Sequence, residues 1–371
     1  MKLTHFLAFL LITLLSHAQN AVDYYDRGQE ALGNQSYQEA IKNFSKAISL
    51  RDSYVNAYIG RGLAYMDIKD YKHAMEDFNE AIYHDNKSYL AYTNRGVVKS
   101  NMQNFRGAFA DFDTALMIAP RDVIARHDRS IARLQIRDYK GALADCDIAV
   151  AEDPSYGEAY LTRGILKYEH MKMPASAVFD FDTAINLLGA TASMLCGRGN
   201  SKSNSLDLAG ALADYNAALA LDPQSAEAYV DRSDCKHKMR DFKGAIEDAT
   251  TAISISPSDY VAYFNRANAK DSLNDHEGAI VDYTNSIRVY PDAAISYCAR
   301  GESKAALKDY QAALLDYDLA IKADPELGEA YYARALTNIK IKQNRGACSD
   351  LKKAIEFDKK EAEELLAKYC K

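Results

Sequence analysis

Apolar and small residues recur along this chain with a period of 34 residues. Within one period they occupy positions 4, 8 and 11 and then positions 20, 24 and 27, as in Tyr58 and Gly62 followed by Ala74, Phe78 and Ala81. Spacings of three and four residues place side chains on one face of an α-helix. Each period is therefore predicted to form two amphipathic helices, and the small residues at positions 8, 20 and 27 let these helices approach closely.

With Ala21 as position 1, the period divides residues 21–361 into ten repeats. They are 21–54, 55–88, 89–122, 123–156, 157–191, 192–225, 226–259, 260–293, 294–327 and 328–361. The fifth repeat carries one extra residue, which we place within 168–177. Six of the seven prolines fall between repeats, where proline ends the second helix, and a following Ser or Asp can cap the next helix, as at Asp259. A chain of 371 residues would otherwise suggest two or three globular domains.

The pattern resembles the tetratricopeptide repeat family in its Arg-Gly form. The residues that carry the resemblance are clearest in the third repeat: Tyr92, Arg95, Gly96, Ala108, Phe112, Ala115 and Pro120. The resemblance covers residues 21–361 and implies an all-α, right-handed superhelical solenoid of ten helix pairs. Residues 362–371 are apolar and charged at helical spacing, so we expect a helix that caps the last repeat. Arg126, Leu195 and Lys359 depart from the family pattern.

Two opposite charges keep the same phase in the repeats. Position 7 is arginine throughout: Arg27, Arg61, Arg95, Arg129, Arg163, Arg198, Arg232, Arg266, Arg300 and Arg334. Position 23 is acidic in nine repeats: Asp77, Asp111, Asp145, Asp180, Asp214, Asp248, Asp282, Asp316 and Asp350. Arginine can hold a carboxylate through two parallel hydrogen bonds. We expect a structural ladder of Arg–Asp pairs, within or between repeats, rather than a functional site copied ten times.

The first residues have the layout of a secretory signal peptide. One lysine precedes the apolar run Phe6–Leu15, and Ser16-His17-Ala18 presents small residues at a cleavage site after Ala18. The run has ten residues, too few to span a bilayer. Residues 1–18 therefore predict an exported chain, periplasmic or secreted, without a membrane-spanning segment. The alternative is a buried N-terminal helix.

Composition and motifs narrow the class of protein. The chain is 48% hydrophobic with a net charge of −7, which fits a folded protein and speaks against a nucleic-acid binder. It has no phosphate-binding loop, nucleophile elbow, His-Glu-x-x-His motif or dinucleotide fingerprint. Ten repeats leave no room for a catalytic domain. We expect no enzyme activity, no cofactor and no metal.

The six cysteines lack the close spacing of redox or zinc motifs. Cys146 occupies a packing position and is expected to act as a small apolar residue. Cys348 begins the last second helix and Cys370 ends the tail, so a folded-back tail would let them form a disulfide. The alternative is two unrelated thiols.

The resemblance implies a concave groove lined by the first helices, in which positions 2, 5, 6 and 9 meet the ligand. None of these forty residues is Lys or Arg, and eight are acidic: Asp26, Asp128, Glu158, Glu227, Asp231, Asp234, Glu302 and Glu329. Three of the eight lie in the first turn of a helix, where the helix dipole alone favours acids. The expected peptide-binding residues, densest in repeats seven to nine, are Asn200, Glu227, Val230, Asp231, Asp234, Phe264, Asn265, Asn268 and Glu302.

In this hypothesis the asparagines bind a peptide backbone, the acids bind its Lys or Arg, and Val230 and Phe264 contact its apolar side chains. The alternative is a solvated acidic surface. Groove residues without Lys or Arg also exclude the subclass that grips a C-terminal carboxylate. The expected function is an exported scaffold for a basic or polar protein segment. The rivals are a structural or assembly component of the cell envelope, acting through its ends or convex face, and a carbohydrate accessory, which the absence of Trp disfavours.

Overall fold

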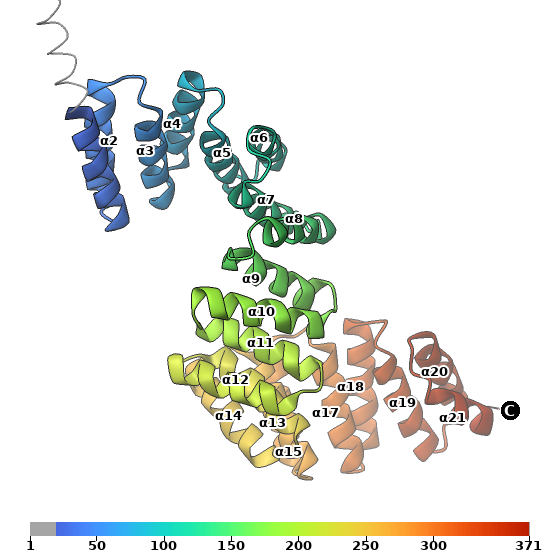
Figure 1. The fold of residues 1–371 in the computed structure, drawn as a ribbon. Coiled ribbons are helices and arrows are strands. Elements are labelled where there is room, and N and C mark those ends of the chain that lie inside the picture. Colours follow the sequence, from blue (N-terminus) through green and yellow to red (C-terminus); the bar gives the residue numbers. More distant parts are fainter. Residues whose placement is uncertain (1–19, 371) are drawn as a thin grey trace, which may run out of the picture. The chain divides into compact units, whose positions relative to one another are not determined.

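The protein is described by a computed structural model that covers residues 20–370, in which every regular element is a helix (Figure 1). The predicted signal peptide lies outside the described residues. The first helices of the repeats are 20–33, α3 (Val55–Asp67), α5 (Tyr89–Asn101), α7 (Val123–Gln135), α9 (Gly157–Ile165), α11 (Ala192–Asn204), α13 (Ala226–Lys238), α15 (Tyr260–Ser272), α17 (Ala294–Ala306) and α19 (Gly328–Lys340). The second helices are α2 (Tyr37–Leu50), α4 (Tyr71–His84), α6 (Phe105–Ile118), α8 (Tyr139–Glu152), α10 (Pro174–Leu188), α12 (Leu208–Leu221), α14 (Phe242–Ile255), α16 (His276–Val289), α18 (Tyr310–Ala323) and α20 (Asn344–Glu356). The predicted all-α architecture of helix pairs is confirmed.

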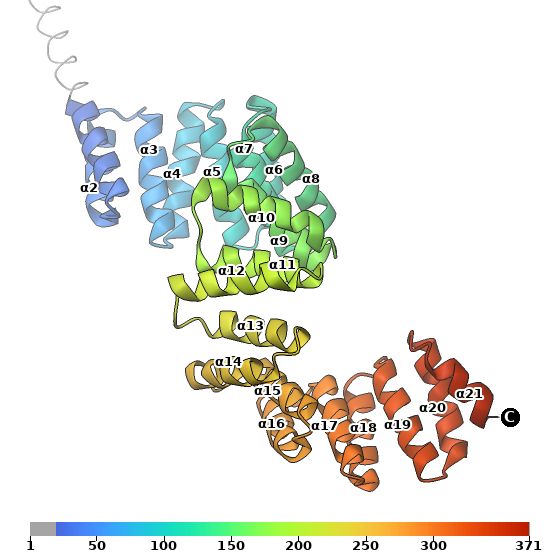
Figure 2. The ribbon, with the colours of Figure 1, turned by 60° about the horizontal axis from the view of Figure 1, so that its bottom comes forward.

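The helices form two compact units. The first consists of the described residues up to Met173 with Thr183–Leu188, and the second of Pro174–Asp182 with the chain from Gly189 onward. Within each unit the first helix of a repeat packs on its own second helix, which packs on the next first helix, as α15 to α19 show in Figure 2. Each unit is therefore a solenoid of stacked helix pairs.

First helices of neighbouring repeats also contact one another. In the first unit α3 packs on α5 and α5 on α7, and in the second unit α11, α13, α15, α17 and α19 pack in sequence. Among the described helices, no two consecutive second helices pack against each other to the same extent. The first helices therefore line the inside of the curve of each unit, and we call this side the inner face.

The close approach within a helix pair depends on a small residue at position 8, which is glycine in repeats such as the second and the ninth. A Cβ atom on Gly62 would lie 2.7 Å from the ring of Phe78, and one on Gly301 would lie 2.6 Å from the ring of Tyr317. Both rings are buried at position 24 of the same repeat. The predicted packing role of small residues at this position is confirmed.

Each first helix is followed, in its connection to the second helix, by a residue with left-handed backbone conformation. The residues are Gln35, Lys69, Gln103, Arg137, Lys172, Leu206, Arg240, Asn274, Lys308 and Lys342, all with φ between 53° and 66°. None is glycine, the residue that adopts this conformation without strain. The second helix follows directly, and an Asp or Asn commonly caps it, as where Asp138 accepts the backbone N–H of Gly141 at 3.0 Å. The connection within a helix pair is therefore short and closely defined.

The extra residue of the fifth repeat is absorbed by a π-helical turn, Leu166–His170, that continues α9. The Met171 N–H donates to the Leu166 carbonyl at 3.1 Å, an i→i+5 bond. The left-handed residue of this repeat, Lys172, comes one position later than in its neighbours. The insertion thus lies at the start of the region predicted for it and leaves the following repeats in phase.

The tail closes the second unit. Helix α21 (Ala362–Tyr369) packs on α20, with Ala362 and Leu366 in a cluster around the buried Leu351. A disulfide joins Cys348 and Cys370, whose Cα atoms lie 5.6 Å apart. The expected capping helix and the expected cysteine pair therefore lie together at the end of the solenoid.

Candidate binding face

The Arg–Asp pairs lie within repeats. Arg266 donates from Nε and Nη2 to the two carboxylate oxygens of Asp282, at 2.9 and 2.7 Å. The same two bonds join seven other pairs: Arg61–Asp77, Arg95–Asp111, Arg129–Asp145, Arg198–Asp214, Arg232–Asp248, Arg300–Asp316 and Arg334–Asp350. The arginine therefore fixes its first helix to its own second helix, as a structural ladder requires.

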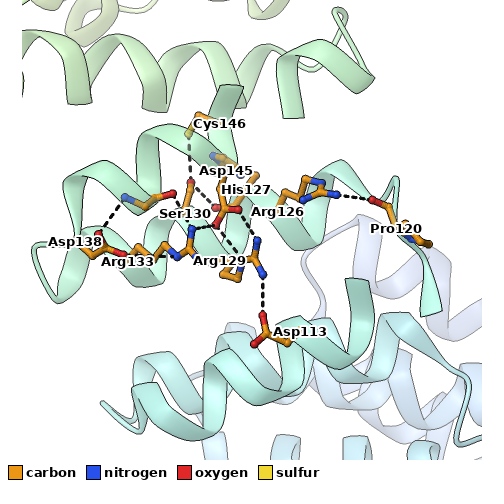
Figure 3. Close-up of polar contacts among 11 residues, drawn as sticks. Asp113, Pro120, Arg126, His127, Arg129, Ser130, Arg133, Asp138, Asp145 and Cys146 are labelled. Carbon is orange, nitrogen blue, oxygen red and sulfur yellow. Dashed lines mark hydrogen bonds and ion pairs between the residues drawn. The ribbon is translucent and has the colours of Figure 1, made fainter. Parts of the chain in front are cut away.

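The remaining guanidinium nitrogen reaches the preceding repeat. Figure 3 shows Arg129 between Asp145 of its own repeat and Asp113 of the repeat before, with Nη1 2.7 Å from the Asp113 carboxylate. Arg163 makes the corresponding bond to Asp147 at 2.8 Å. A second cation often joins the carboxylate at position 23, as where Arg133 pairs with Asp145 at 2.9 Å. The sequence pattern did not reveal these additional partners of the ladder, either between repeats or within them.

The expected peptide-binding residues all lie on first helices of the second unit, between α11 and α17. Two of them are unavailable to a ligand. Asn265 and Val230 are only 8% and 7% exposed. The Asn265 side-chain amide donates to the Val230 carbonyl and to Ser233 Oγ, at 3.2 and 3.0 Å, which ties α15 to α13. This burial leaves little of either side chain for a peptide to contact, and Val230 packs against Ala252 of α14 and Ala262 of α15.

Four other residues of this set already have partners. Asp234 pairs with Lys238 one turn later on the same helix, at 2.7 Å. Asn200 donates to Asp231 at 2.9 Å, which joins α11 to α13. Asn268 accepts the Tyr283 hydroxyl at 2.6 Å through its carbonyl oxygen. These bonds orient polar side chains of the inner face, and they leave Glu227 and Glu302 as its exposed acids in repeats seven and nine.

The electrostatics of this face disfavour further negative charge. Burial raises the pKa of Asp231 to about 6; the hydrogen bond from Asn200 opposes the shift, and the nearby charges of Glu227, Asp234 and Asp259 add to it. Glu302 is exposed as a whole residue, but the protein atoms around its carboxyl desolvate it and raise its pKa to about 7, with added repulsion from Glu329 and Asp271 and partial compensation by Lys359. In both carboxyls burial is the first cause of the shift, and neighbouring carboxylates add to it. A cation brought to this face would be attracted to them.

A cavity of about 360 Å³ opens between α15 and α17. Tyr260, Phe264 and Tyr290 contribute aromatic rings, and the Tyr260 and Tyr290 ring centroids lie 4.9 Å apart. Asp292 and Asp324 contribute two carboxylates to the same cavity. Only Phe264 was expected at a binding site. The available signal was tyrosine at position 1, which occurs only in repeats three and eight.

The tyrosine of the third repeat marks a corresponding cavity in the first unit. This cavity measures about 520 Å³ and is lined by Tyr89, Arg121, Ile124 and the loop between α6 and α7. It occupies the same position in repeats three and four as the other does in repeats eight and nine. The shared tyrosine thus accompanies a cavity in both units.

Other kinds of site find no support in the described part of the chain. Within residues 20–370, no group of three or more His, Cys, Asp or Glu side chains could hold a metal ion. No helix in this range is long and apolar enough to cross a membrane. The cysteines outside the disulfide, Cys146, Cys196, Cys235 and Cys298, are buried, and burial raises the pKa of each thiol.

Comparison with known proteins identifies the repeat. A family model described as tetratricopeptide repeat matches residues 25–90, 196–260 and 264–328. Among solved structures, yeast Tom70 aligns over 95% of this chain and 96% of its own, with 14% identity and a TM-score of 0.53. A structure of Pseudomonas aeruginosa pilF aligns over 57% of this chain and 96% of its own, with 18% identity and a TM-score of 0.51. At these identities the likeness concerns the fold alone. No curated protein matches the sequence.

Proposed function

The chain belongs to the tetratricopeptide repeat family, and we propose that it acts as a protein-binding scaffold whose inner face in repeats seven to nine holds a segment bearing Lys or Arg. The family generally comprises non-enzymatic scaffolds. The ladder makes the repeats a stiff support, and the inner face presents side chains that the ladder does not use.

One observation carries the proposal: the carboxyls of Asp231 and Glu302 lie on this face with other carboxylates near them, Glu227 and Asp234 beside the first and Glu329 and Asp271 beside the second. A ligand cation would offset the repulsion between these groups, since opposite charges a few ångströms apart favour the charged carboxylate. The negative inner face would also speed encounter with basic segments. Glu227 and Glu302 are exposed enough to contact ligand cations directly. Phe264 and Asn268 lie on the first helix of the eighth repeat, between the repeats that carry these two acids.

A binding assay with matched variants tests the proposal. Fluorescence polarisation measures the affinity of the full chain for a labelled Lys-containing peptide and for the same peptide with Glu in place of Lys. We expect only the basic peptide to bind, with an affinity that falls as salt rises. In the variant Asp231→Asn/Glu302→Gln the affinity should fall about tenfold, or roughly 1.4 kcal/mol.

The control variant, Glu247→Gln/Glu277→Gln, removes the same charge from exposed positions on the second helices α14 and α16. It should bind the basic peptide as the wild type does. Equal weakening in both variants would mean that the peptide responds to net charge alone, and the inner-face proposal would fail.

A second candidate function is self-assembly through the second helices. Val281 on α16 and Leu315 on α18 occupy the same repeat position and are 60% and 65% exposed. Exposed apolar side chains at the same position of successive second helices can join two copies of a chain. Sedimentation tests this: assembly predicts oligomers that increase with concentration and that Val281→Ser/Leu315→Ser disperses.

Export remains part of the proposal and rests on residues 1–18. Cleavage after Ala18 would give a mature chain beginning at Gln19. N-terminal sequencing of the protein from fractionated host cells tests this directly. An intact Met1 terminus in a cytoplasmic fraction would contradict it.

A further inference from the structure

The cavity between α15 and α17 combines two kinds of wall. Tyr260, Tyr290 and Phe264 present aromatic surface, and Tyr260 and Tyr290 are 38% and 45% exposed. Asp292 and Asp324 line the same space, and one Asp324 oxygen is already held by the Glu326 N–H at 2.9 Å. Aromatic faces attract cations, and carboxylates bind them through charge-assisted hydrogen bonds. An apolar side chain would use only the first of these features.

The cavity also opens on the face already proposed to bind. Val261, Phe264 and Ile295 lie at positions 2 and 5 of their repeats, on the stripe that carries Asp231 and Glu302. Its volume of about 360 Å³ lies at the small end of ligand-sized cavities and suits a side chain rather than a folded partner. A segment that follows the inner face can thus place one side chain in it.

The corresponding cavity of the first unit supplies the contrast. It keeps the tyrosine at position 1, Tyr89, but Ala119 stands where the second unit has Tyr290. Arg121 stands where the second unit has Asp292, and Thr93 where it has Phe264. The first cavity therefore lacks two aromatic rings, and its lining holds Arg121 beside a single carboxylate, Asp122. The cation-binding combination is specific to repeats eight and nine.

We infer that the cavity lined by Tyr260, Phe264, Tyr290, Asp292 and Asp324 receives an arginine side chain of the bound segment. The planar guanidinium stacks on the tyrosine rings and donates to the carboxylates, while the aliphatic stem contacts Val261 and Ile295. Lysine, a more strongly hydrated point charge, is held less well. The inference rests on the proposed function, because it names one anchor of the segment that the inner face binds.

Fluorescence polarisation with the full chain tests the anchor. Labelled peptides share two lysines and differ at a central residue, which is Arg, Lys or norleucine. We expect the Arg peptide to bind about tenfold more tightly than the norleucine peptide, with the Lys peptide between them. Tyr290→Leu and Asp292→Arg should each remove the preference for Arg, while Tyr89→Leu in the first unit should leave it unchanged.

The outcomes separate this inference from the proposed function. If all three peptides bind equally and Asp231→Asn/Glu302→Gln still weakens them, the arginine anchor is overturned and the inner-face proposal stands. A norleucine peptide that binds best, or a preference that Tyr89→Leu abolishes, also overturns the anchor. If no peptide binds, the inner-face proposal fails.

In that last case the cavity is tested alone. Saturation-transfer NMR with N-acetyl-arginine amide needs no peptide path along the inner face. A signal that disappears in Tyr290→Leu supports the arginine site, and no signal from the wild type overturns it.

Discussion

Replacing Arg266 with methionine should weaken one junction of the solenoid while leaving the helices formed. Arg266 is 18% exposed and Asp282 only 2%, so their two bonds are largely shielded from water. A third bond, from Arg266 Nη1 to Thr250 Oγ1 at 3.2 Å, ties α15 to the preceding repeat. The methionine keeps the apolar stem but loses all three bonds.

The expected loss of stability depends on which partners the Asp282 carboxylate keeps in Arg266→Met. Hydrogen bonds to charged groups contribute about 1.5–3 kcal/mol each, and stranding one partner of a buried ion pair costs about 3–5 kcal/mol. In Arg266→Met the Asp282 carboxylate still contacts Lys270 Nζ at 2.7 Å, so its charge is not stranded. We therefore expect a loss of about 2 kcal/mol, below the cost of a stranded charge.

Hydrogen exchange followed by mass spectrometry measures this locally. A loss of about 2 kcal/mol corresponds to roughly 30-fold faster exchange where the rate follows the equilibrium between closed and open states. The faster amides should lie in α14, α15 and α16, because each repeat contacts only its neighbours, and α3 to α6 should not change. Circular dichroism should show unaltered helix content. Arg288→Met, at an exposed position on α16, is the control.

Unchanged exchange in α14 to α16 would refute the view that the ladder holds repeats together. Equal acceleration throughout the second unit would instead refute the view that its repeats respond locally.

Three further outcomes are expected. Leu206→Gly should raise the unfolding temperature, because it relieves backbone strain of about 1 kcal/mol at φ 66° and the leucine, which is 84% exposed, loses little packing. A lower unfolding temperature would contradict this. Because burial raises the pKa of Asp231 to about 6, the folded state favours the protonated carboxyl, and the stability that this gives below about pH 4 is lost as the pH rises through 6. In thermal melts across that window, the unfolding temperature of Asp231→Asn should therefore rise relative to that of the wild type. Parallel curves for the two proteins would refute the assignment. Thiol counting after denaturation should give four thiols without reductant and six with it, and six thiols without reductant would exclude the disulfide. Because the Cys348–Cys370 bond closes a loop at the chain end, Cys370→Ser should speed amide exchange in α21 with little change in α17.

Much of the fold could be predicted because the repeat averages the sequence signal. Ten copies of the same spacing make a helix pair evident even where single residues, such as Arg126 or Leu195, break the pattern. The residues 16 apart that form the Arg–Asp pairs were visible for the same reason. The contacts of the third guanidinium nitrogen were not, because position 25 varies among Ser, Asn, Asp and Thr, and any of these can accept a hydrogen bond.

The candidate site was predicted less well because its residues differ between repeats. Position numbers from the family placed Asn265 and Val230 at the ligand, but exposure there depends on how closely successive first helices approach. The Asn265 amide reaches the Val230 carbonyl, and so these residues form an internal contact. The cavity was missed because Tyr290, Asp292 and Asp324 come from connecting segments rather than from the stripe on the first helices.

The ladder also sets a rule for how such a chain can change length. Eight arginines of the ladder, from Arg61 to Arg129 and from Arg198 to Arg334, find partners 16 residues before and 16 residues after themselves, as Arg198 does with Asp182 and Asp214. Duplication or loss of whole 34-residue units therefore reconnects each arginine to an equivalent acceptor, wherever the junction falls. A single inserted residue would break that match, unless a helix takes it up before the next acceptor, as the turn at Leu166–His170 does. Growth by complete repeats thus keeps every Arg–Asp cross-link of the ladder. Insertions of a single residue are confined to sites where the backbone can absorb the extra residue.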